Sequence, residues 1–314
     1  MAARKRKSVE PVHSSESQMT FSRFLQLFPD NDACLDYLRD KFYPAGTECP
    51  HCHKASKFHR VKGRSSYSCQ YCRGQVYPTA GTIFHKSTTS LQLWFWAIYL
   101  MSSTRCGMSA KQLEREIGVS YPTAHRMFKQ IRSLLSDADG NPLSGKVEMD
   151  ETGVGGKPRA NQLKTRQERR AWADQKATVF GMVERGGQVR AFVVPDRKGA
   201  TLGEYARRNV DAGATIYTDE FPLYVGLGRG YADHKRIKHK ARIYAEGDVT
   251  TNSIEGFFAM LKNAIIGVHH GVSKEHLQSY VDEYTFRFNR RDGRTPLFWA
   301  ILDRVQKNDG LAAQ

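Results

Sequence analysis

Four cysteines near the start of the chain have the residue type and the spacing of a metal site. Cys49 with Cys52, and Cys69 with Cys72, form two Cys-x2-Cys pairs separated by 16 residues. Each pair can lie on a tight turn that directs two thiolates inward, and two such turns make the closed tetrahedral S4 site that holds structural Zn2+. We therefore expect a zinc ribbon whose cysteines fold the segment and take no part in catalysis.

A redox motif is the alternative interpretation of a Cys-x-x-Cys pair, but that chemistry needs one pair in a βαβ setting. Three nearby histidines could each replace a thiolate, although four cysteines already fill the site: His51, His53 and His59. Cys34 and Cys106 show no pairing pattern, which fits a reducing, intracellular compartment.

Two aspartates farther along the chain follow predicted strands. Asp150 follows a short strand over residues 146–149, where Glu148 shares its face, and Asp219 follows a strand over residues 215–218. Reactive groups of α/β proteins lie at strand ends, so both are candidates for catalysis. The alternative is that each is only a turn or cap residue.

A helix predicted to begin near Asn252 offers a third polar group. At about 100° per residue, Lys262 falls about 20° and Asn252 about 60° from Glu255, so the three share one polar stripe. The apolar face behind them would pack on the sheet: Ile254, Phe257, Phe258, Leu261, Ala264 and Ile265.

Carboxylates that meet in one place repel one another unless a cation neutralises them. Mg2+ prefers carboxylate oxygen, and two Mg2+ ions roughly 4 Å apart can clamp the attacking and leaving oxygens of an in-line phosphoryl displacement. Asp150 and Asp219 would hold these ions, and Lys262 would contact a phosphate or base beside the cut. Strand alternation directs the rival carboxylates Glu151 and Glu220 away from the side that their neighbours use.

The charge of the chain indicates a polyanionic partner. Its 314 residues carry a net charge of +16, and 40% of them are hydrophobic, enough to bury a proper core. Nucleic acid is the first expectation and an anionic membrane surface the weaker one. No stretch resembles a signal peptide or a membrane-spanning helix, because the most apolar window, residues 91–101, is too short to span a bilayer.

Two segments are candidates for binding DNA. Residues 109–134 have a helix-turn-helix pattern, with a plain helical hairpin as the alternative. Its second helix would present five side chains to a groove: Tyr121, Thr123, His125, Arg126 and Lys129. A basic loop over residues 157–175 would grip phosphates with six cations: Lys157, Arg159, Lys164, Arg166, Arg169 and Arg170.

The order of elements indicates a multidomain α/β protein. We expect a disordered basic tail in residues 1–18, N-terminal helices in 19–45, the zinc ribbon in 46–86, the helix-turn-helix module in 87–140, a catalytic domain in 141–300 and a C-terminal tail in 301–314. The stretch over 231–249, with the loosely spaced His234 and His239, is assigned no role.

Several blocks of the sequence resemble bacterial insertion-sequence DDE-type transposases, in the subgroup with an N-terminal zinc ribbon and an Asp-Asp-Asn/Glu-Lys catalytic motif. The blocks are residues 149–157, 217–219, 251–280 and 284–291. The resemblance implies an RNase H-like catalytic domain, with a mixed sheet flanked by helices. It also implies Mg2+-dependent cleavage and joining of DNA at the terminal inverted repeats of the element.

The third metal ligand of that subgroup is commonly Asn. The resemblance therefore places Asn252 third, Glu255 as second choice and Lys262 as an accessory cation, whereas charge alone favours Glu255. The expected cofactors are structural Zn2+ and catalytic Mg2+, with Mn2+ as the alternative. The expected partners are double-stranded DNA, as element ends and target, and further copies of the chain in a dimer or higher oligomer. No membrane partner is expected, and the expected location is the nucleoid in the bacterial cytoplasm.

Two other functions stay open. A domesticated or inactive transposase-derived protein would bind specific DNA without cutting it, although it would not need every polar residue of the motif. Another RNase H-like nuclease, such as a junction resolvase, is the second alternative. Short inverted repeats flanking the gene would favour transposition.

Overall fold

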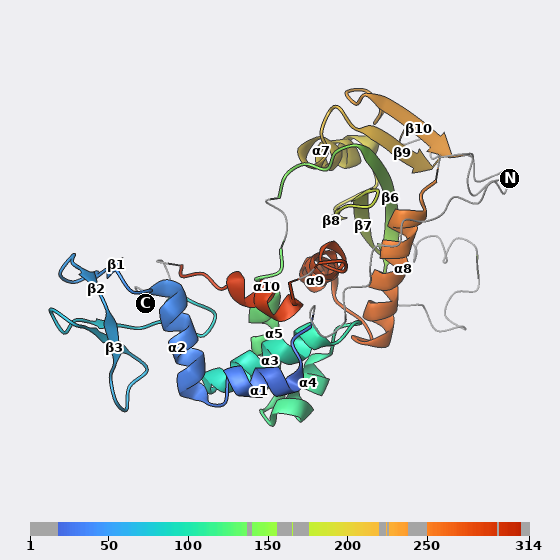
Figure 1. Ribbon diagram of the computed structural model, residues 1–314. Coiled ribbons are helices and arrows are strands. Elements are labelled where there is room, and N and C mark those ends of the chain that lie inside the picture. The colour runs from blue at the N-terminus through green and yellow to red at the C-terminus, as the bar shows by residue number, and fades with distance from the viewer. Residues whose placement is uncertain are drawn as a thin grey trace, which may run out of the picture. The chain divides into compact units, whose positions relative to one another are not determined.

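The computed structural model describes residues 18–136, 140–155, 165, 176–219, 224, 226–237, 250–293 and 295–308. The chain divides into two compact units (Figure 1), unit 1 of Met1–Leu134 with Gly293–Gln314 and unit 2 of Leu135–Asp292. The expected basic tail, apart from Gln18, lies outside the described residues. So do all the cations of the expected basic loop: Lys157, Arg159, Lys164, Arg166, Arg169 and Arg170.

Unit 1 begins with two short helices, α1 (Phe21–Leu27) and α2 (Asn31–Phe42), as the sequence predicts. Asp30 starts the second helix, because its side chain accepts a 2.8 Å hydrogen bond from the backbone N–H of Ala33. Helices α3 (Leu91–Ser103) and α10 (Leu297–Asp303) complete this group. Among the helices that the structure describes, none has the length and apolar character needed to cross a membrane.

The end of the chain contributes to the core of unit 1. Phe298 of α10 has its ring centroid 5.9 Å from that of Phe24 in α1 and 5.7 Å from that of Phe28. The sequence did not indicate this helix, because its apolar residues pack against elements near the start of the chain.

A pair of helices follows the pattern expected over residues 109–134. These are α4 (Ala110–Ile117) and α5 (Tyr121–Arg132). The hydroxyl of Ser109 accepts a 3.1 Å hydrogen bond from the N–H of Gln112 and caps α4. Gly118 ends α4 with a φ of 70°, a left-handed conformation that glycine adopts without steric cost.

The zinc ribbon of unit 1 consists of very short strands. In the described residues, β1 (Thr47–Glu48) pairs with β2 (Ala55–Ser56), and β3 (Phe58–Arg60), β4 (Tyr67–Cys69) and β5 (Gln75–Val76) form a second antiparallel sheet. Strands of two or three residues bury too little apolar surface to be stable alone, so the ribbon needs another source of stability.

Unit 2 is built on a mixed sheet whose described strands have the order β10-β9-β6-β7-β8. The strands are β6 (Lys146–Val154), β7 (Ala177–Glu184), β8 (Val189–Val194), β9 (Thr215–Asp219) and β10 (Asp233–Ile237). Neighbours β10, β9 and β6 run parallel, whereas β7 is antiparallel to both β6 and β8.

Two of these strands correct the sequence prediction. Strand β6 does not end at Met149 but continues to Val154, because β7 pairs with it along that length. Asp150 therefore lies inside a strand and not at its exit. Strand β10 lies in the stretch over 231–249 to which no role was assigned, and its parallel pairing with β9 provides the backbone partners.

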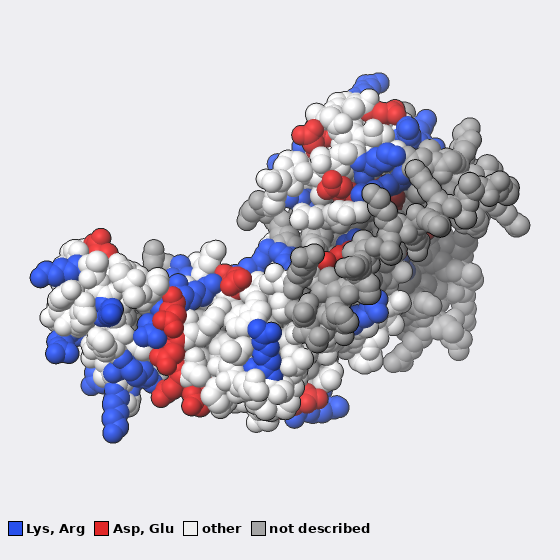
Figure 2. Space-filling view, viewed as in Figure 1, with Lys and Arg blue, Asp and Glu red and all other residues white. Residues whose placement is uncertain are grey.

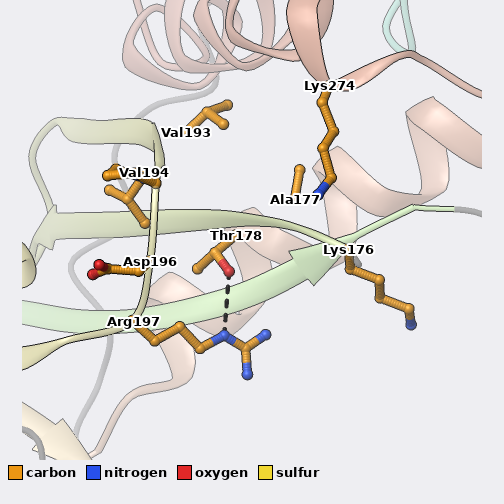
Figure 3. Close-up of a pocket in the computed structure, with 9 residues that line it drawn as sticks. Lys176, Ala177, Thr178, Val193, Val194, Asp196, Arg197 and Lys274 are labelled. Atoms are coloured by element: carbon orange, nitrogen blue, oxygen red, sulfur yellow. Dashed lines mark hydrogen bonds between the residues drawn. The ribbon is translucent and has the colours of Figure 1, made fainter. Parts of the chain in front are cut away.

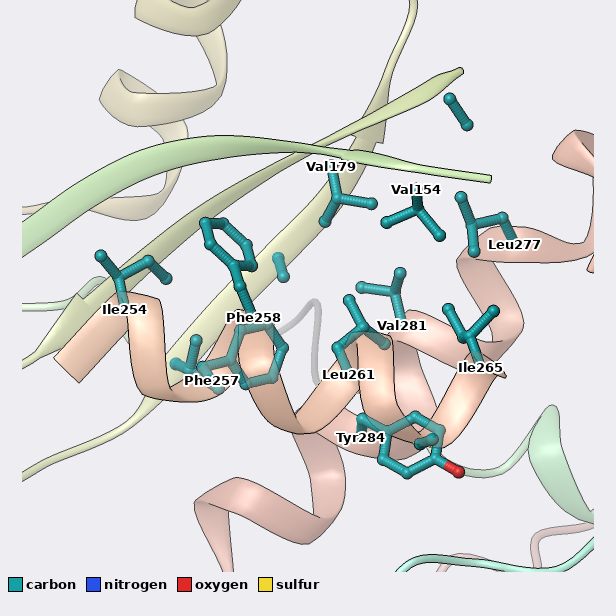
Figure 4. Close-up of a cluster of buried hydrophobic side chains, with 14 of the residues drawn as sticks. Val154, Val179, Ile254, Phe257, Phe258, Leu261, Ile265, Leu277, Val281 and Tyr284 are labelled. Atoms are coloured by element: carbon teal, nitrogen blue, oxygen red, sulfur yellow. The ribbon is translucent and has the colours of Figure 1, made fainter. Parts of the chain in front are cut away.

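Helices cover both faces of the sheet (Figure 1). Helix α7 (Gly199–Asn209) packs on one face, and α8 (Asn252–Gly267) and α9 (Leu277–Asn289) pack on the other. Figure 4 shows the apolar side chains of α8 and α9 meeting those of the strands, with Ile254, Phe258 and Val179 among them. This mixed α/β arrangement is consistent with the expected RNase H-like domain.

A glycine in β7 sets how closely α8 approaches the sheet. A Cβ atom at Gly181 would lie 2.6 Å from Cδ1 of Ile254 and 2.9 Å from Cζ of Phe258, both on α8. Gly181 is also the cross-strand partner of Asp150. The absence of a side chain at this position therefore brings the start of α8 close to Asp150.

We predict that Gly181→Ala lowers the free energy of unfolding by about 1–3 kcal/mol, the usual cost of overpacking. Gly256→Ala is the matched control, because Gly256 lies inside α8 with nothing within 4 Å of an added Cβ. That control should raise stability by about 0.5–1 kcal/mol through helix propensity. Urea unfolding measures both, and equal effects of the two substitutions would contradict the close approach.

Candidate active site and zinc centre

The register of the sheet brings Asp150 and Asp219 together. Strands β6 and β9 pair in parallel, with Glu148 beside Tyr217. Asp150 and Asp219 each follow this last printed pair by two residues, and they are near enough for the charge of Asp219 to raise the pKa of Asp150. Strand β9 ends at Asp219. Both aspartates therefore lie just beyond the segment over which β6 and β9 are paired.

Both aspartates face helix α8. Val147 and Met149 belong to the core beneath α7, so strand alternation turns Asp150 to the opposite face. Ile216 belongs to the same core beneath α7, and Asp219 therefore also faces α8. The face that Glu148 and Asp150 were expected to share is the one that α8 covers.

The polar stripe expected on α8 is present. Its apolar neighbours are buried, as the periodicity predicts: Ile254, Phe257, Phe258, Leu261, Ala264 and Ile265. Asn252 and Glu255 are exposed in the first turn, and Lys262 is half-buried farther along. The Thr251 hydroxyl donates a 3.0 Å hydrogen bond to Oε1 of Glu255.

The carboxylates of the two strands and the helix act on one another electrostatically. Burial, followed by the negative charges of Glu151, Asp219 and Glu255, raises the pKa of Asp150 to about 7. The backbone N–H of Glu151, 2.8 Å from Oδ1 of Asp150, opposes this rise. A carboxyl group with such a raised pKa lies in a field that favours a cation.

The donor atoms suit a hard cation. Carboxylate oxygens of Asp150, Asp219 and Glu255, with the amide oxygen of Asn252, are of the type that Mg2+ prefers. In the part of the chain that the structure describes, only the ribbon cysteines form a group of three or more ligands within 4.8 Å of one another. The carboxylates are thus near enough to shift a pKa but stand wider apart than a closed metal site.

Glu151 points away from this group, as strand alternation predicts. On the α7 face it accepts a hydrogen bond from the hydroxyl of Tyr224, which is fully buried. Burial and the charge of Glu151 raise the pKa of Tyr224, so the phenol remains a donor. No sequence pattern indicates this pair, because the contact joins distant segments. The other rival, Glu220, lies outside the described residues.

Glu148 is the residue near the site whose importance the sequence analysis missed. It is fully buried, and it binds Arg185 at 2.7 Å and the backbone N–H of Ser253 at 2.8 Å. A charged residue between apolar ones in a buried strand could have signalled this, since a buried charge requires a partner.

The four ribbon cysteines fit a zinc ion. Sγ of Cys49 lies 3.7 Å from that of Cys72, and Sγ of Cys52 lies 3.9 Å from that of Cys69. A Zn–S distance of about 2.3 Å in a tetrahedron requires about 3.8 Å between sulfurs. The ribbon therefore has the geometry of a structural Zn2+ site, with every cysteine used.

The two metal-binding turns are built alike. The residue after each pair, His53 and Arg73, has a positive φ of 58° and 63°. Each donates its backbone N–H to the carbonyl of the first cysteine, at 2.9 and 3.1 Å. Backbone N–H groups of Tyr71 and Gly74 also donate to sulfur, at 3.4 Å each, which stabilises the thiolates.

The second helix of the expected helix-turn-helix has a polar outer face. Tyr121, His125, Arg126 and Lys129 are exposed, and Thr123 is half-buried. The Arg126 guanidinium lies 5.5 Å from the ring centroid of Trp94. Figure 2 shows lysine and arginine side chains distributed over unit 1, with an acidic band over α2.

Unit 2 also has a cationic cleft of about 610 Å3 (Figure 3), formed at the start of β7 and the end of β8. Its cations are Lys176, Arg197 and Lys274, and Nε of Arg197 donates a 3.2 Å hydrogen bond to the hydroxyl of Thr178. Thr178 is three residues along β7 from the partner of Asp150, or about 10 Å. Asp196 also lines the cleft, so its charge is mixed although cations predominate.

Comparisons with known proteins agree with this architecture. Residues 142–289 match the family described as "ISXO2-like transposase domain", and residues 29–75 match the "Transposase zinc-ribbon domain". The chain is 31% identical over 256 residues to "Uncharacterized protein in transposable element ISH50" of Halobacterium salinarum, covering 77% of this chain and 85% of that protein.

A second relative is shorter. The chain is 32% identical over 120 residues to "Uncharacterized transposase-like protein" of Haemophilus influenzae, which covers 38% of this chain and 94% of that protein. The mixed α/β fold is consistent with these matches, which define a transposase. The chain belongs to the ISXO2-like transposase family with an N-terminal transposase zinc ribbon.

We predict that the purified chain binds one zinc ion through the ribbon cysteines. Cys52→Ser should abolish zinc retention and lower the melting temperature, because binding of a structural Zn2+ contributes about 10–16 kcal/mol to folding of such segments. Cys106→Ser is the control, since Cys106 is exposed and lies outside the cluster. Elemental analysis and thermal unfolding measure the effects. Full zinc content in Cys52→Ser would contradict the four-cysteine site.

A second prediction concerns Asp150. Because its pKa rises from 3.8 to about 7 on folding, the native state binds more protons than the unfolded state between these values. Its charge therefore destabilises the metal-free protein fully above pH 7, and the effect disappears near pH 4. Asp150→Asn should raise stability at pH 8, in buffer without Mg2+ or a chelator, by up to about 4 kcal/mol.

The stability gain of Asp150→Asn should shrink as the pH falls towards 4. Urea unfolding at several pH values measures this gain. Asp196→Asn should have the opposite sign, because the Thr201 hydroxyl and the backbone N–H of Lys198 lower the pKa of Asp196. A variant Asp150→Asn that is less stable than the wild type at pH 8 would show that the repulsion is absent.

Proposed function

We propose that this protein is a DDE-type DNA transposase that binds the terminal inverted repeats of an insertion sequence and catalyses Mg2+-dependent strand cleavage and strand transfer. The observation that supports this proposal is the raised pKa of Asp150, which lies two residues beyond the last parallel pair of β6 and β9 and is affected by the charges of Asp219 and Glu255. Two Mg2+ ions would relieve the repulsion and act on the phosphodiester.

The chain's own groups would have separate roles. Asp150 and Asp219 would hold the ions, with Asn252 or Glu255 from α8 as third ligand, and Mn2+ could replace Mg2+. The resemblance ranks Asn252 first, while the effect of Glu255 on the pKa of Asp150 supports Glu255. When bound, the ions would supply an activated water or 3′-hydroxyl and neutralise the leaving oxygen. Lys262 would contact a nearby phosphate.

DNA contacts would come from both units. The polar face of α5, with Arg126 and Lys129, would enter a groove of the element ends. The cleft with Lys176, Arg197 and Lys274 would bind phosphates, and the basic loop over residues 157–175 would add further contacts. We further propose that a dimer or higher oligomer acts on double-stranded element ends and target DNA, at the nucleoid in the bacterial cytoplasm.

A protein that binds DNA without cutting it is the second candidate. Among the described residues, the carboxylates form no group of three ligand atoms within 4.8 Å, whereas the ribbon cysteines do, and this favours it. It predicts specific binding to flanking inverted repeats with no Mg2+-dependent product.

The test is cleavage and joining of DNA that carries the flanking ends, with Mg2+ or Mn2+. Asp150→Asn and Asp219→Asn should each lower the rate by at least about 100-fold, since metal-mediated stabilisation of charge is worth several kcal/mol. Both variants should still bind the ends in a gel-shift assay.

Glu204→Gln is the control, because Glu204 is an exposed carboxylate of unit 2 that pairs with Arg208 on α7. Undiminished joining by either aspartate variant would refute the assigned roles. Specific binding by the wild type with no cleavage under either ion would favour the second candidate.

A further inference from the structure

An ion pair between the fully buried Glu148 and the partly exposed Arg185 lies near the candidate active site. Glu148 has no exposed surface, and Nε of Arg185 donates a 2.7 Å hydrogen bond to its Oε1. Burial of a carboxylate costs several kcal/mol unless nearly all of its lone pairs are used. The hydrogen-bond partners of Glu148 therefore indicate the role of its carboxylate.

Those partners belong to the first turn of α8. Oε2 of Glu148 accepts hydrogen bonds from the backbone N–H groups of Ser253, at 2.8 Å, and Ile254, at 3.2 Å. Oε1 accepts a third from the Ser253 hydroxyl at 3.2 Å. The residue at the N-cap, Thr251, makes no side-chain capping bond. A strand residue thus caps the helix, and its negative charge lies at the positive end of the helix dipole.

Arg185 extends the attachment to the segment before the helix. Its Nη2 donates a 2.7 Å hydrogen bond to the carbonyl of Thr250, and its guanidinium lies 4.0 Å from the ring centroid of Tyr217. Its backbone N–H donates to the carbonyl of Lys146 at 2.9 Å. One side chain therefore ties the approach to α8 to the two strands that carry the aspartates.

The position of this network relates it to the candidate ligands. Glu148 and Tyr217 precede Asp150 and Asp219 by two residues on the same face, or about 7 Å along each strand. Ser253, which Glu148 binds, lies next to Asn252. The network is thus one layer of side chains away from the aspartates, and it fixes the end of α8 that supplies the third ligand.

We infer that Glu148 and Arg185 are positioning residues, whose buried ion pair docks the first turn of α8 against the strands of Asp150 and Asp219 and thereby sets the geometry for Mg2+. This inference rests on the proposed function. Residues that orient metal ligands typically affect metal affinity or activity by about 10–100-fold. A purely structural ion pair would affect stability alone.

The test compares Glu148→Gln with Glu283→Gln. Glu283 is equally buried and pairs with Arg287 at 2.9 Å, but the two belong to the same helix, α9. Both substitutions remove a buried charge, so both should lower the melting temperature. Only Glu148→Gln should raise the Mg2+ concentration at half-maximal DNA cleavage, by about tenfold or more. An equal Mg2+ requirement in the two variants would overturn the inference.

Further measurements decide the role of Glu148 if a variant does not fold or if the wild type does not cleave DNA. Ser253→Ala removes one bond to Glu148 and keeps the charge, so it serves if Glu148→Gln does not fold, with a smaller rise in Mg2+ requirement expected. Amide hydrogen exchange at Ser253 and Ile254 should accelerate in Glu148→Gln and stay unchanged in Glu283→Gln. If the wild type does not cleave DNA, the proposed function fails, and exchange together with the Mg2+-induced shift in melting temperature still decides the role of the network.

Discussion

Repulsion between acidic side chains is the constraint on which unit 2 depends. Burial, followed by the negative charges of Glu151, Asp219 and Glu255, raises the pKa of Asp150 and makes its ionised form unfavourable. Such an arrangement persists only if other interactions hold the elements in place. Two apolar cores do so, one beneath α7 and one beneath α8 and α9. The acidic site is unfavourable without cations, and for the same reason it favours cation binding.

The approach of α8 is controlled at two points. Gly181 leaves room for Ile254 and Phe258 to reach the sheet, and Glu148 accepts the first N–H groups of the helix. One contact is apolar and limits the distance, while the other is polar and directional and fixes the end of the helix. Together they place Asn252 and Glu255 on the side of the sheet that carries both aspartates.

Unit 1 achieves stability differently. Its ribbon strands are two or three residues long, and the four cysteines supply the cross-links that a larger apolar core would otherwise provide. Its helices share an aromatic core to which α10 contributes from the end of the chain. The exposed polar face of α5 can therefore lie on a rigid support, with Arg126 packed over Trp94.

Local patterns were enough to predict many elements. The pair of helices over residues 109–134 and the apolar period of α8 are present as expected, because each depends on residues close in sequence. Strand β6 was predicted too short and β10 was missed. Residues after Met149 are polar and glycine-containing, and β10 is rich in charge, so only pairing with β7 and β9 makes these segments strands.

The sequence by itself determined the zinc ligands and the polar stripe of α8, since the spacing of cysteines and the pitch of a helix are local quantities. Tertiary structure decided the rest. The parallel pairing of β6 and β9 placed Asp150 and Asp219, which are distant in the chain, two residues beyond the last pair of two adjacent strands. Tertiary structure also made Glu148 a buried cap of α8, because the role of a charged residue depends on the groups that surround it.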